Sequence, residues 1–461
     1  MNIPLITMTH VCRSWRNVLL STPSLWTRLD FSVSTKSQQA EGFVPRSGNQ
    51  LLDVHHFLEH QDDVEPFLST TLHNISRLQQ LEIGSSLSHL GNLLRNFSVP
   101  APELKHLRIS NNPSVTAKLP IIFGGRLPKL TSLSLHHLFT NLHIFNFPSL
   151  TRFEFTTGHI VTVPFLISFF ERCPSLEFIQ LCFTYPPRPP TDHHRHLVRL
   201  DTLKELRLDQ TACTSGLLDH LILPTCEEMM LKGQFTGEMF DHYGSPAARI
   251  HPSSIDHLPV TRGVTKAVAM PNACVLSGPN GNLRFWCFEG GARGDFDAEY
   301  FTSFSPISVS EIRELWVGQS TMSIFWPKPW EQSVTGICGA FGVLTKVEDL
   351  TIVGCNMRPF SMALGMAAAA DADSGILLPA LQRLTVYAVC RDLDILDLIR
   401  CARARKEHSR PLGEVTIVFG EVAATDLILK VESLREIVGE VKHRVGEAPM
   451  LIWRGLDCDD W

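Results

Sequence analysis

A six-residue pattern, LxxLxL, recurs along this chain and restricts its fold more than any other feature. Apolar residues hold its first, fourth and sixth positions, as in LQQLEI and LKHLRI. In a β-strand the fourth and sixth side chains point to one side, and the residue between them points to the other. One short strand cannot bury its apolar side alone, so we expect parallel copies to stack around a continuous core. The eleven copies begin at Leu78, Leu104, Leu130, Leu150, Leu176, Leu203, Cys226, Ile312, Val347, Leu381 and Leu412.

The spacing of the copies leaves room for a helix or a turn after each strand. Neighbouring copies start about 20 to 27 residues apart up to Cys226, and about 31 to 35 residues apart beyond Ile312. The pattern resembles the leucine-rich repeat family over roughly residues 26–420, although the Asn or Cys typical of its ninth position is mostly absent. The resemblance implies an α/β fold, an irregular leucine-rich-repeat-like solenoid with parallel strands. An ordinary α/β domain with several parallel strands is the alternative.

The repeat is interrupted between residues 232 and 310. Two apolar runs in this region flank Asn280–Gly281, a turn signal that predicts a β-hairpin. Degenerate copies of the repeat hidden in the same region are the alternative. We therefore expect a solenoid over residues 29–425 that carries an irregular insertion at about 232–310.

The last part of the chain has helical spacing. Its apolar residues predict a helix that ends at Gly446 and covers the open end of the solenoid. We assign residues 426–461 to this C-terminal helix cap and to an acidic tail, LDCDDW. The residues of the helical stripe are Val431, Leu434, Val438, Val441 and Val445.

The first 28 residues carry a second pattern. Val11, Trp15, Val18 and Leu19 fall on one face of a helix. Thr22-Pro23 then has the form of an N-cap followed by proline at the first helical position. The next residues, WTRLDF, already match the repeat unit. The segment therefore predicts two short helices that lead into the first strand.

The stretch VCRSWRNVLLSTPSLW resembles the second half of an F-box, and the chain as a whole is similar to the F-box-like proteins of mushroom-forming fungi. In that family the F-box binds a Skp-type adaptor, which links it to a cullin complex, and the repeats hold the protein to be ubiquitinated. The resemblance implies that residues 1–28 are a short all-α partial F-box, N-terminally truncated, because no L-P-x-E-I-L-like helix precedes His10. An N-terminal cap for the solenoid is the alternative role. The resemblance assigns adaptor binding to Val11, Trp15, Val18, Leu19, Leu25 and Trp26.

The third, fifth and seventh positions of each repeat should line the side of the strands that faces away from the core. Their mixed polar side chains, with one tryptophan, suit protein recognition. A merely solvated surface is the alternative for each of them. The residues that we predict to bind the target protein are His106, Arg108, His136, Arg152, Glu154, Arg207, Asp209 and Trp316.

Composition and charge exclude several classes of binding partner. A net charge of −6 provides no basic face for nucleic acid. The start has no secretory signal, and the most apolar segment, VTVPFLISFF, is about half the length of a membrane span, so we expect no membrane partner. None of the twelve cysteines forms a CxxC pair, which favours buried free thiols in a reducing compartment. We therefore expect a cytoplasmic or nuclear protein without a metal or another cofactor.

The motifs indicate binding and not catalysis. The chain has no G-x-S-x-G and no HExxH, and we interpret TDHHRH, from Thr191, as a polar loop and not a metal site. We therefore expect a non-enzymatic substrate-recognition subunit of an SCF-type E3 ubiquitin ligase. It would bind a target on the repeat surface and the adaptor through the F-box. The alternative is a ubiquitin-independent leucine-rich-repeat scaffold in which the F-box remnant is an N-terminal cap.

Overall fold

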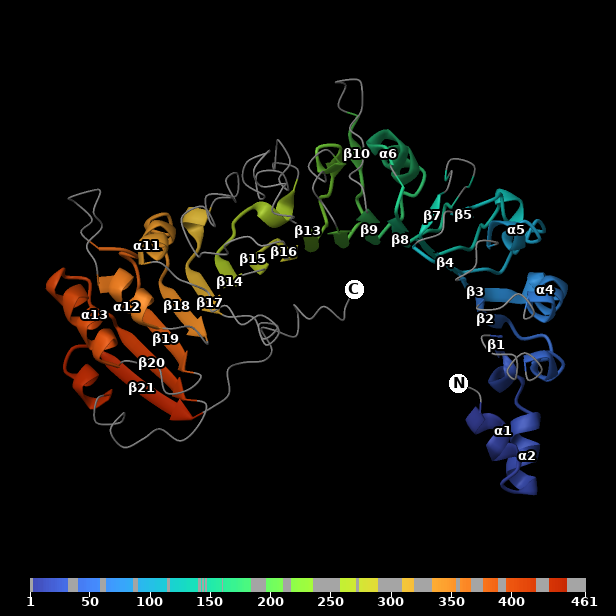
Figure 1. The fold of residues 1–461 in the computed structure, drawn as a ribbon, viewed down its shortest axis with the longest axis horizontal. Coiled ribbons are helices and arrows are strands. Elements are labelled where there is room, and N and C mark those ends of the chain that lie inside the picture. Colours follow the sequence, from blue (N-terminus) through green and yellow to red (C-terminus); the bar gives the residue numbers. More distant parts are fainter. Residues whose placement is uncertain are drawn as a thin grey trace. The chain divides into compact units, whose positions relative to one another are not determined.

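The chain is an α/β protein in which seventeen strands belong to a mostly parallel sheet, as the repeat predicts (Figure 1). It divides into two compact units, unit 1 (Met1–Thr225) and unit 2 (Cys226–Trp461). The computed structural model describes residues 3–31, 40–58, 64–85, 90–113, 117–139, 142, 145, 147–159, 161–183, 196–209, 217–234, 258–270, 273–288, 309–318, 334–353, 357–365, 376–388, 395–419 and 431–445.

Unit 1 is built on eight parallel strands that pair in chain order. They are β1 (Arg28–Asp30), β2 (Leu52–Leu58), β3 (Leu78–Ser85), β4 (His106–Asn111), β6 (Ser132–His136), β8 (Arg152–Thr157), β9 (Phe178–Phe183) and β11 (Glu205–Asp209). Two short parallel pairs stand apart from them, β5 (Ala117–Lys118) with β7 (Leu138–Phe139) and β10 (Val198–Arg199) with β12 (Leu221–Ile222).

The α-helices that connect the strands of unit 1 lie on one side of these strands (Figure 1). They are α4 (Val64–His73), α5 (Leu90–Leu94) and α6 (Val163–Glu171). Two 3-10 turns also lie between strands, η3 (Ile75–Arg77) before β3 and η4 (Phe123–Gly125) before β6. Before β1 come α1 (Ile3–Thr9), α2 (Arg13–Leu20) and the 3-10 turn η1 (Pro23–Trp26). We call the side of the strands opposite α4, α5 and α6 the open face of unit 1.

Burial follows the repeat closely. In every one of the eleven copies, the residues at the first, fourth and sixth positions are at most 3% exposed. In ten of the copies the strand begins at the third position. β3 begins at the first position, Leu78, and pairs with β4 from Gln80 onward. The predicted core positions are therefore confirmed, and each buried leucine or isoleucine contributes about 1.5–3 kcal/mol.

Unit 2 continues with parallel strands but includes an antiparallel part. Its strands are β13 (Glu228–Gln234), β14 (Lys266–Met270), β15 (Ala273–Gly278), β16 (Gly281–Phe288), β17 (Glu314–Gly318), β18 (Asp349–Val353), β19 (Arg383–Ala388), β20 (Glu414–Phe419) and β21 (Glu440–Val445). Its described residues include the helices η6 (Pro259–Thr261), η7 (Val309–Glu311), α11 (Val334–Gly342), α12 (Met357–Gly365) and α13 (Ile395–Glu407). No helix in the described ranges of either unit combines the length and apolar composition needed to cross a membrane.

The predicted hairpin is present, with its turn one residue earlier than expected. β15 and β16 pair antiparallel, and Gly278 faces Gly281 across a two-residue turn. β16 also pairs parallel with β13, while β14 pairs antiparallel with β15 and parallel with β17. A degenerate repeat is present as well, since Val264, Ala267 and Ala269 are buried at the spacing of the first, fourth and sixth positions.

The predicted C-terminal helix is wrong in its second half. Residues 431–435 are helical, but Glu440–Val445 form strand β21, which pairs parallel with β20. The backbone N–H and C=O groups of this segment form hydrogen bonds with the free edge of β20. Valine is β-branched and packs well on a strand, which also favours β21 over a helix. Val441 is buried there at 7% exposed. Gly446 and the acidic tail lie outside the described residues.

Arginines on the helix side tie neighbouring repeats together. Arg77 donates from Nε to the carbonyl of Gln50 at 2.9 Å, and Arg172 donates to that of Phe145 at 3.0 Å. Arg405, at 0% exposed, reaches two carbonyls of the preceding repeat, one of them Leu377 at 2.9 Å. These bonds satisfy loop carbonyls that the parallel strands leave unpaired.

Candidate binding surfaces

The first surface is formed by α2 and η1. Cys12 caps α2, because its Sγ accepts a hydrogen bond from the backbone N of Trp15 at 3.4 Å. Pro23 starts η1 as predicted, but Thr22 is not a side-chain cap: its hydroxyl donates back to the carbonyl of Val18 at 2.7 Å. The helix α1, which the sequence pattern did not predict, packs beside α2 (Figure 1).

Six large apolar side chains in this segment are exposed to solvent. Six others reach comparable exposure in all the rest of the described residues, so half of them lie within 18 positions. Val11, Trp15 and Val18 are 65%, 52% and 60% exposed. Trp15 and Val18 lie three residues apart on one side of α2, whereas Val11, which we expected in the same helix, precedes α2 in the turn that follows α1. Apolar surface concentrated in this way marks interaction sites. We call it the N-terminal apolar surface; it consists of Met8, Val11, Trp15, Val18, Leu20 and Leu25.

The structure places the other two predicted adaptor residues in the core. Trp26 is 0% exposed and Leu19 is 7% exposed. The indole Nε1 of Trp26 donates to the carbonyl of Leu19 at 2.8 Å, and its ring meets Phe43 edge-on with centroids 4.9 Å apart. The guanidinium of Arg46 lies over the ring at 4.9 Å. This pair therefore fixes α2 against the repeats and offers no surface to a partner.

The second surface is the open face of unit 1. Strand register puts residues of neighbouring repeats side by side in rows. One row contains Gln80, His106, Ser132 and Arg152, and the next contains Glu82, Arg108, Ser134 and Glu154. Four predicted target-binding residues, His106, Arg108, Arg152 and Glu154, are thus brought together, and His136 lies in the third row.

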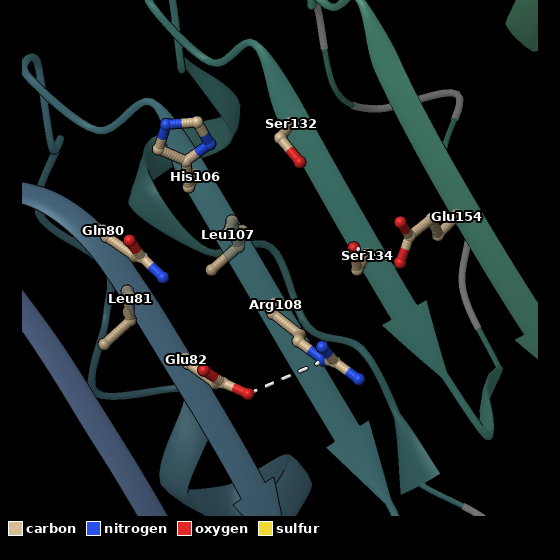
Figure 2. Close-up of a pocket in the computed structure, with 9 residues that line it drawn as sticks. All are labelled: Gln80, Leu81, Glu82, His106, Leu107, Arg108, Ser132, Ser134 and Glu154. Carbon is tan, nitrogen blue, oxygen red and sulfur yellow. Dashed lines mark hydrogen bonds and ion pairs between the residues drawn. The ribbon is translucent and has the colours of Figure 1, made fainter. Parts of the chain in front are cut away.

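An open pocket of about 270 Å³ lies between these two rows (Figure 2). It forms because β6 presents two small side chains, Ser132 and Ser134, between longer ones on β4 and β8. The pocket is lined by Gln80, Leu81, Glu82, His106, Leu107, Arg108, Ser132, Ser134 and Glu154.

The two carboxylates of the pocket are held by partners within the chain. Glu82 accepts a hydrogen bond from His55 Nδ1 at 2.8 Å, and Arg108 Nε lies 3.7 Å away. The bond from His55 lowers the pKa of Glu82. Partial burial by itself would raise the pKa of Glu154, but hydrogen bonds from Ser134 and Arg152, at 2.8 and 2.7 Å, outweigh it and lower that pKa.

His136 lies deeper in the same face. Its Nδ1 is 3.1 Å from the hydroxyl of Thr156, and its buried Nε2 has no hydrogen-bond partner, although Glu154 Oε2 is 4.0 Å away. Burial lowers the pKa of His136, and the positive charge of Arg108 lowers it further. The imidazole is therefore neutral in the folded chain at neutral pH.

The neutral imidazole predicts a loss of stability in acid. Unfolded chains protonate His136 near its ordinary pKa of 6.5, whereas the folded chain does so only at lower pH. We therefore expect the free energy of unfolding to fall as pH drops below about 6.5, and to fall again below about 4.5 as Glu82 and Glu154 protonate. Urea unfolding at a series of pH values measures this, and His136→Gln should make the first decline shallower. His106→Gln is the matched control, and an unchanged slope in His136→Gln would contradict the assignment.

The remaining predicted residues lie elsewhere. Arg207 donates from Nε to Glu205 at 2.5 Å, and the side chain of Asp209 is outside the described part of the structure. Trp316 belongs to unit 2, where its indole N donates to Glu314 at 2.6 Å and its ring stacks on Tyr387 with centroids 6.5 Å apart. Trp316 therefore belongs to an aromatic cluster within unit 2.

Strand β2 is a repeat strand that the LxxLxL pattern missed. His56, at 2% exposed, replaces the apolar sixth position, donates to the carbonyl of Phe31 at 2.9 Å and stacks on Phe67. Its neighbour Phe57 is 45% exposed, and a Cβ at Gly84 would lie 2.4 Å from the Phe57 ring. The signal that could have predicted β2 is the alternation of buried and more exposed residues along LDVHHF, which is the period of two expected of a strand.

The described residues contain no group of three histidine, cysteine or acidic side chains that could hold a metal ion. Most of the TDHHRH stretch, residues 191–195, lies outside them, while His196 is 2.5 Å from a Glu171 carboxylate oxygen. Fold and surfaces together define an α/β repeat protein with an N-terminal apolar surface and a polar open face. No family model, no curated protein and no solved structure matches this chain.

Proposed function

We propose that this chain is a substrate-recognition subunit of an SCF-type ubiquitin ligase. The N-terminal apolar surface would bind a Skp-type adaptor, and the repeats would bind the target protein. The chain would perform no covalent chemistry itself; it would act by holding the target close to the ubiquitin-transfer machinery, which raises the effective concentration of the reacting groups.

The observation that carries the proposal is the exposure of Val11, Trp15 and Val18 in the segment that resembles an F-box. Of the residues of α2, Leu19 alone is buried. A short helix with so little buried surface gains stability when a partner covers its apolar side. Trp15 has the properties of a binding hot spot, since tryptophan dominates many interfaces.

A ubiquitin-independent scaffold is the second candidate. The packing of Trp26 and Leu19 supports it, because these residues join α2 and η1 to the first repeat as a cap would. The two candidates differ in one respect, which is whether the exposed side of α2 binds the adaptor.

Adaptor binding tests the proposal directly. We expect the full chain to bind a Skp-type adaptor in isothermal titration calorimetry, and Trp15→Ala to weaken binding about thirtyfold or more. Val18→Asp should abolish it by placing a charge in an apolar interface. Val99→Asp is the matched control, because Val99 is 53% exposed against 60% for Val18 but lies outside the N-terminal surface. Wild-type protein that fails to bind, or Val18→Asp that binds normally, would favour the scaffold.

A further inference from the structure

The polar groups of the open-face pocket are unequally satisfied. Among the described residues, the side chains of Gln80, His106 and Ser132 form no hydrogen bond, and Arg108 reaches only Glu82, at 3.7 Å. Register aligns Gln80, His106 and Ser132 across three adjacent strands. Arg108 lies in the next row, two residues beyond His106 on β4, and Figure 2 shows its guanidinium near Glu82. The pocket thus has unused hydrogen-bond donors in one place.

The acceptors of the pocket are already engaged. Glu82 is bonded to His55 at 2.8 Å, and Glu154 is paired with Arg152 at 2.6 Å and with Ser134. The guanidinium of Arg108, 54% exposed, lies 3.7 Å from Glu82, which is too far for a hydrogen bond, so its N–H donors remain available to a ligand. A guanidinium offers donors in a planar fork that matches a carboxylate.

We infer that this pocket binds a carboxylate, from an aspartate or glutamate side chain in an extended segment of the target protein. Arg108 pairs with the carboxylate, and His106, Ser132 and Gln80 provide the neighbouring polar contacts. The inference deepens the proposed function by naming the chemistry that its repeat surface recognises.

Other charged groups fit the pocket less well. A phosphoserine carries about −1.5 to −2 charges, which is more than the single guanidinium among the lining residues, that of Arg108, can pair. A lysine or arginine would meet Arg108 while both carboxylates are occupied. A single negative charge on a planar group best matches the donors that remain.

A random peptide display library, selected on the immobilised full-length protein, tests the inference. We expect one position of the selected peptides to be enriched in Asp or Glu, and this enrichment to disappear on Arg108→Gln protein. Arg95→Gln, which removes an exposed arginine of unit 1 away from the pocket, is the matched control and should retain the enrichment. Enrichment in basic residues, no acidic position, or enrichment that survives Arg108→Gln overturns the inference.

A double-mutant cycle then locates the contact. A selected peptide should bind about ten- to a hundredfold more weakly when its acidic residue becomes glutamine, and Arg108→Gln protein should show little further loss. The same peptide with phosphoserine at that position should bind more weakly than the parent; tighter binding overturns the carboxylate assignment. Adaptor titration of Arg108→Gln should match wild type, so failure of this inference and failure of adaptor binding are separate results.

Discussion

Trp26→Ala should lower the free energy of unfolding of unit 1 by about 3–5 kcal/mol, the range for removing a fully buried tryptophan. Trp26 is 0% exposed, and the cavity would open between Leu19, Phe43 and Arg46. The substitution also leaves the carbonyl of Leu19 without the indole donor, which adds a cost of about 1 kcal/mol or more. Urea unfolding followed by far-UV circular dichroism measures the loss.

Two further variants show whether the stability lost in Trp26→Ala comes from the burial of this tryptophan. Trp26→Phe keeps much of the ring volume and should recover most of the stability, leaving mainly the loss of the hydrogen bond. Trp15→Ala removes an indole that is 52% exposed and should change stability by about 1 kcal/mol at most. If both alanine variants lost the same stability, the division of the two tryptophans between core and surface would be wrong.

Gly281→Ala should destabilise unit 2 by about 3 kcal/mol or more. Gly281 has φ +124°, a conformation that side chains rarely adopt, and a Cβ there would lie 2.0 Å from the carbonyl oxygen of Glu227. That oxygen accepts the backbone N–H of Asn282 at 2.7 Å. The clash is with backbone and cannot be relieved by a rotamer change, so β13 and β16 must separate. Hydrogen exchange of the amides in β13 and β16 reports this opening.

Gly342→Ala is the matched control for this prediction. Gly342 ends helix α11, and a Cβ added there meets nothing within 4 Å. Alanine should leave stability unchanged or raise it by up to about 1 kcal/mol, because it favours the helix. Protection in β13 and β16 that survives Gly281→Ala would show that the hairpin does not depend on a glycine at this turn.

The repeat pattern predicted the strands well because its signal is local. Leucine or isoleucine at the first, fourth and sixth positions defines both the strand and the side that it buries. Where the residue type changes, the signal fails: His56 takes an apolar position in β2, and Ala267 and Ala269 do so in β14. Pairing with adjacent strands stabilises both β2 and β14. His56 is stabilised in its buried position by its hydrogen bond to the carbonyl of Phe31 and by stacking on Phe67.

The C-terminal segment shows the opposite failure. Valines at helical spacing predicted a helix, yet Val441 lies in β21. An apolar spacing of three or four residues also fits the first and fourth positions of the repeat, so the sequence alone does not separate the two structures. The pairing with β20 decides in favour of the strand.

The sequence by itself determined the repeated strands, their buried positions and the two short helices before the first of them, because each depends on residues close together in the chain. The tertiary structure decided which side chains are available to partners. It buried Trp26 and exposed Trp15, and it joined Glu82, Arg108 and Glu154 from three repeats around one pocket. Exposure and side-chain pairing depend on how residues from distant parts of the chain pack against one another, and no local pattern encodes that packing.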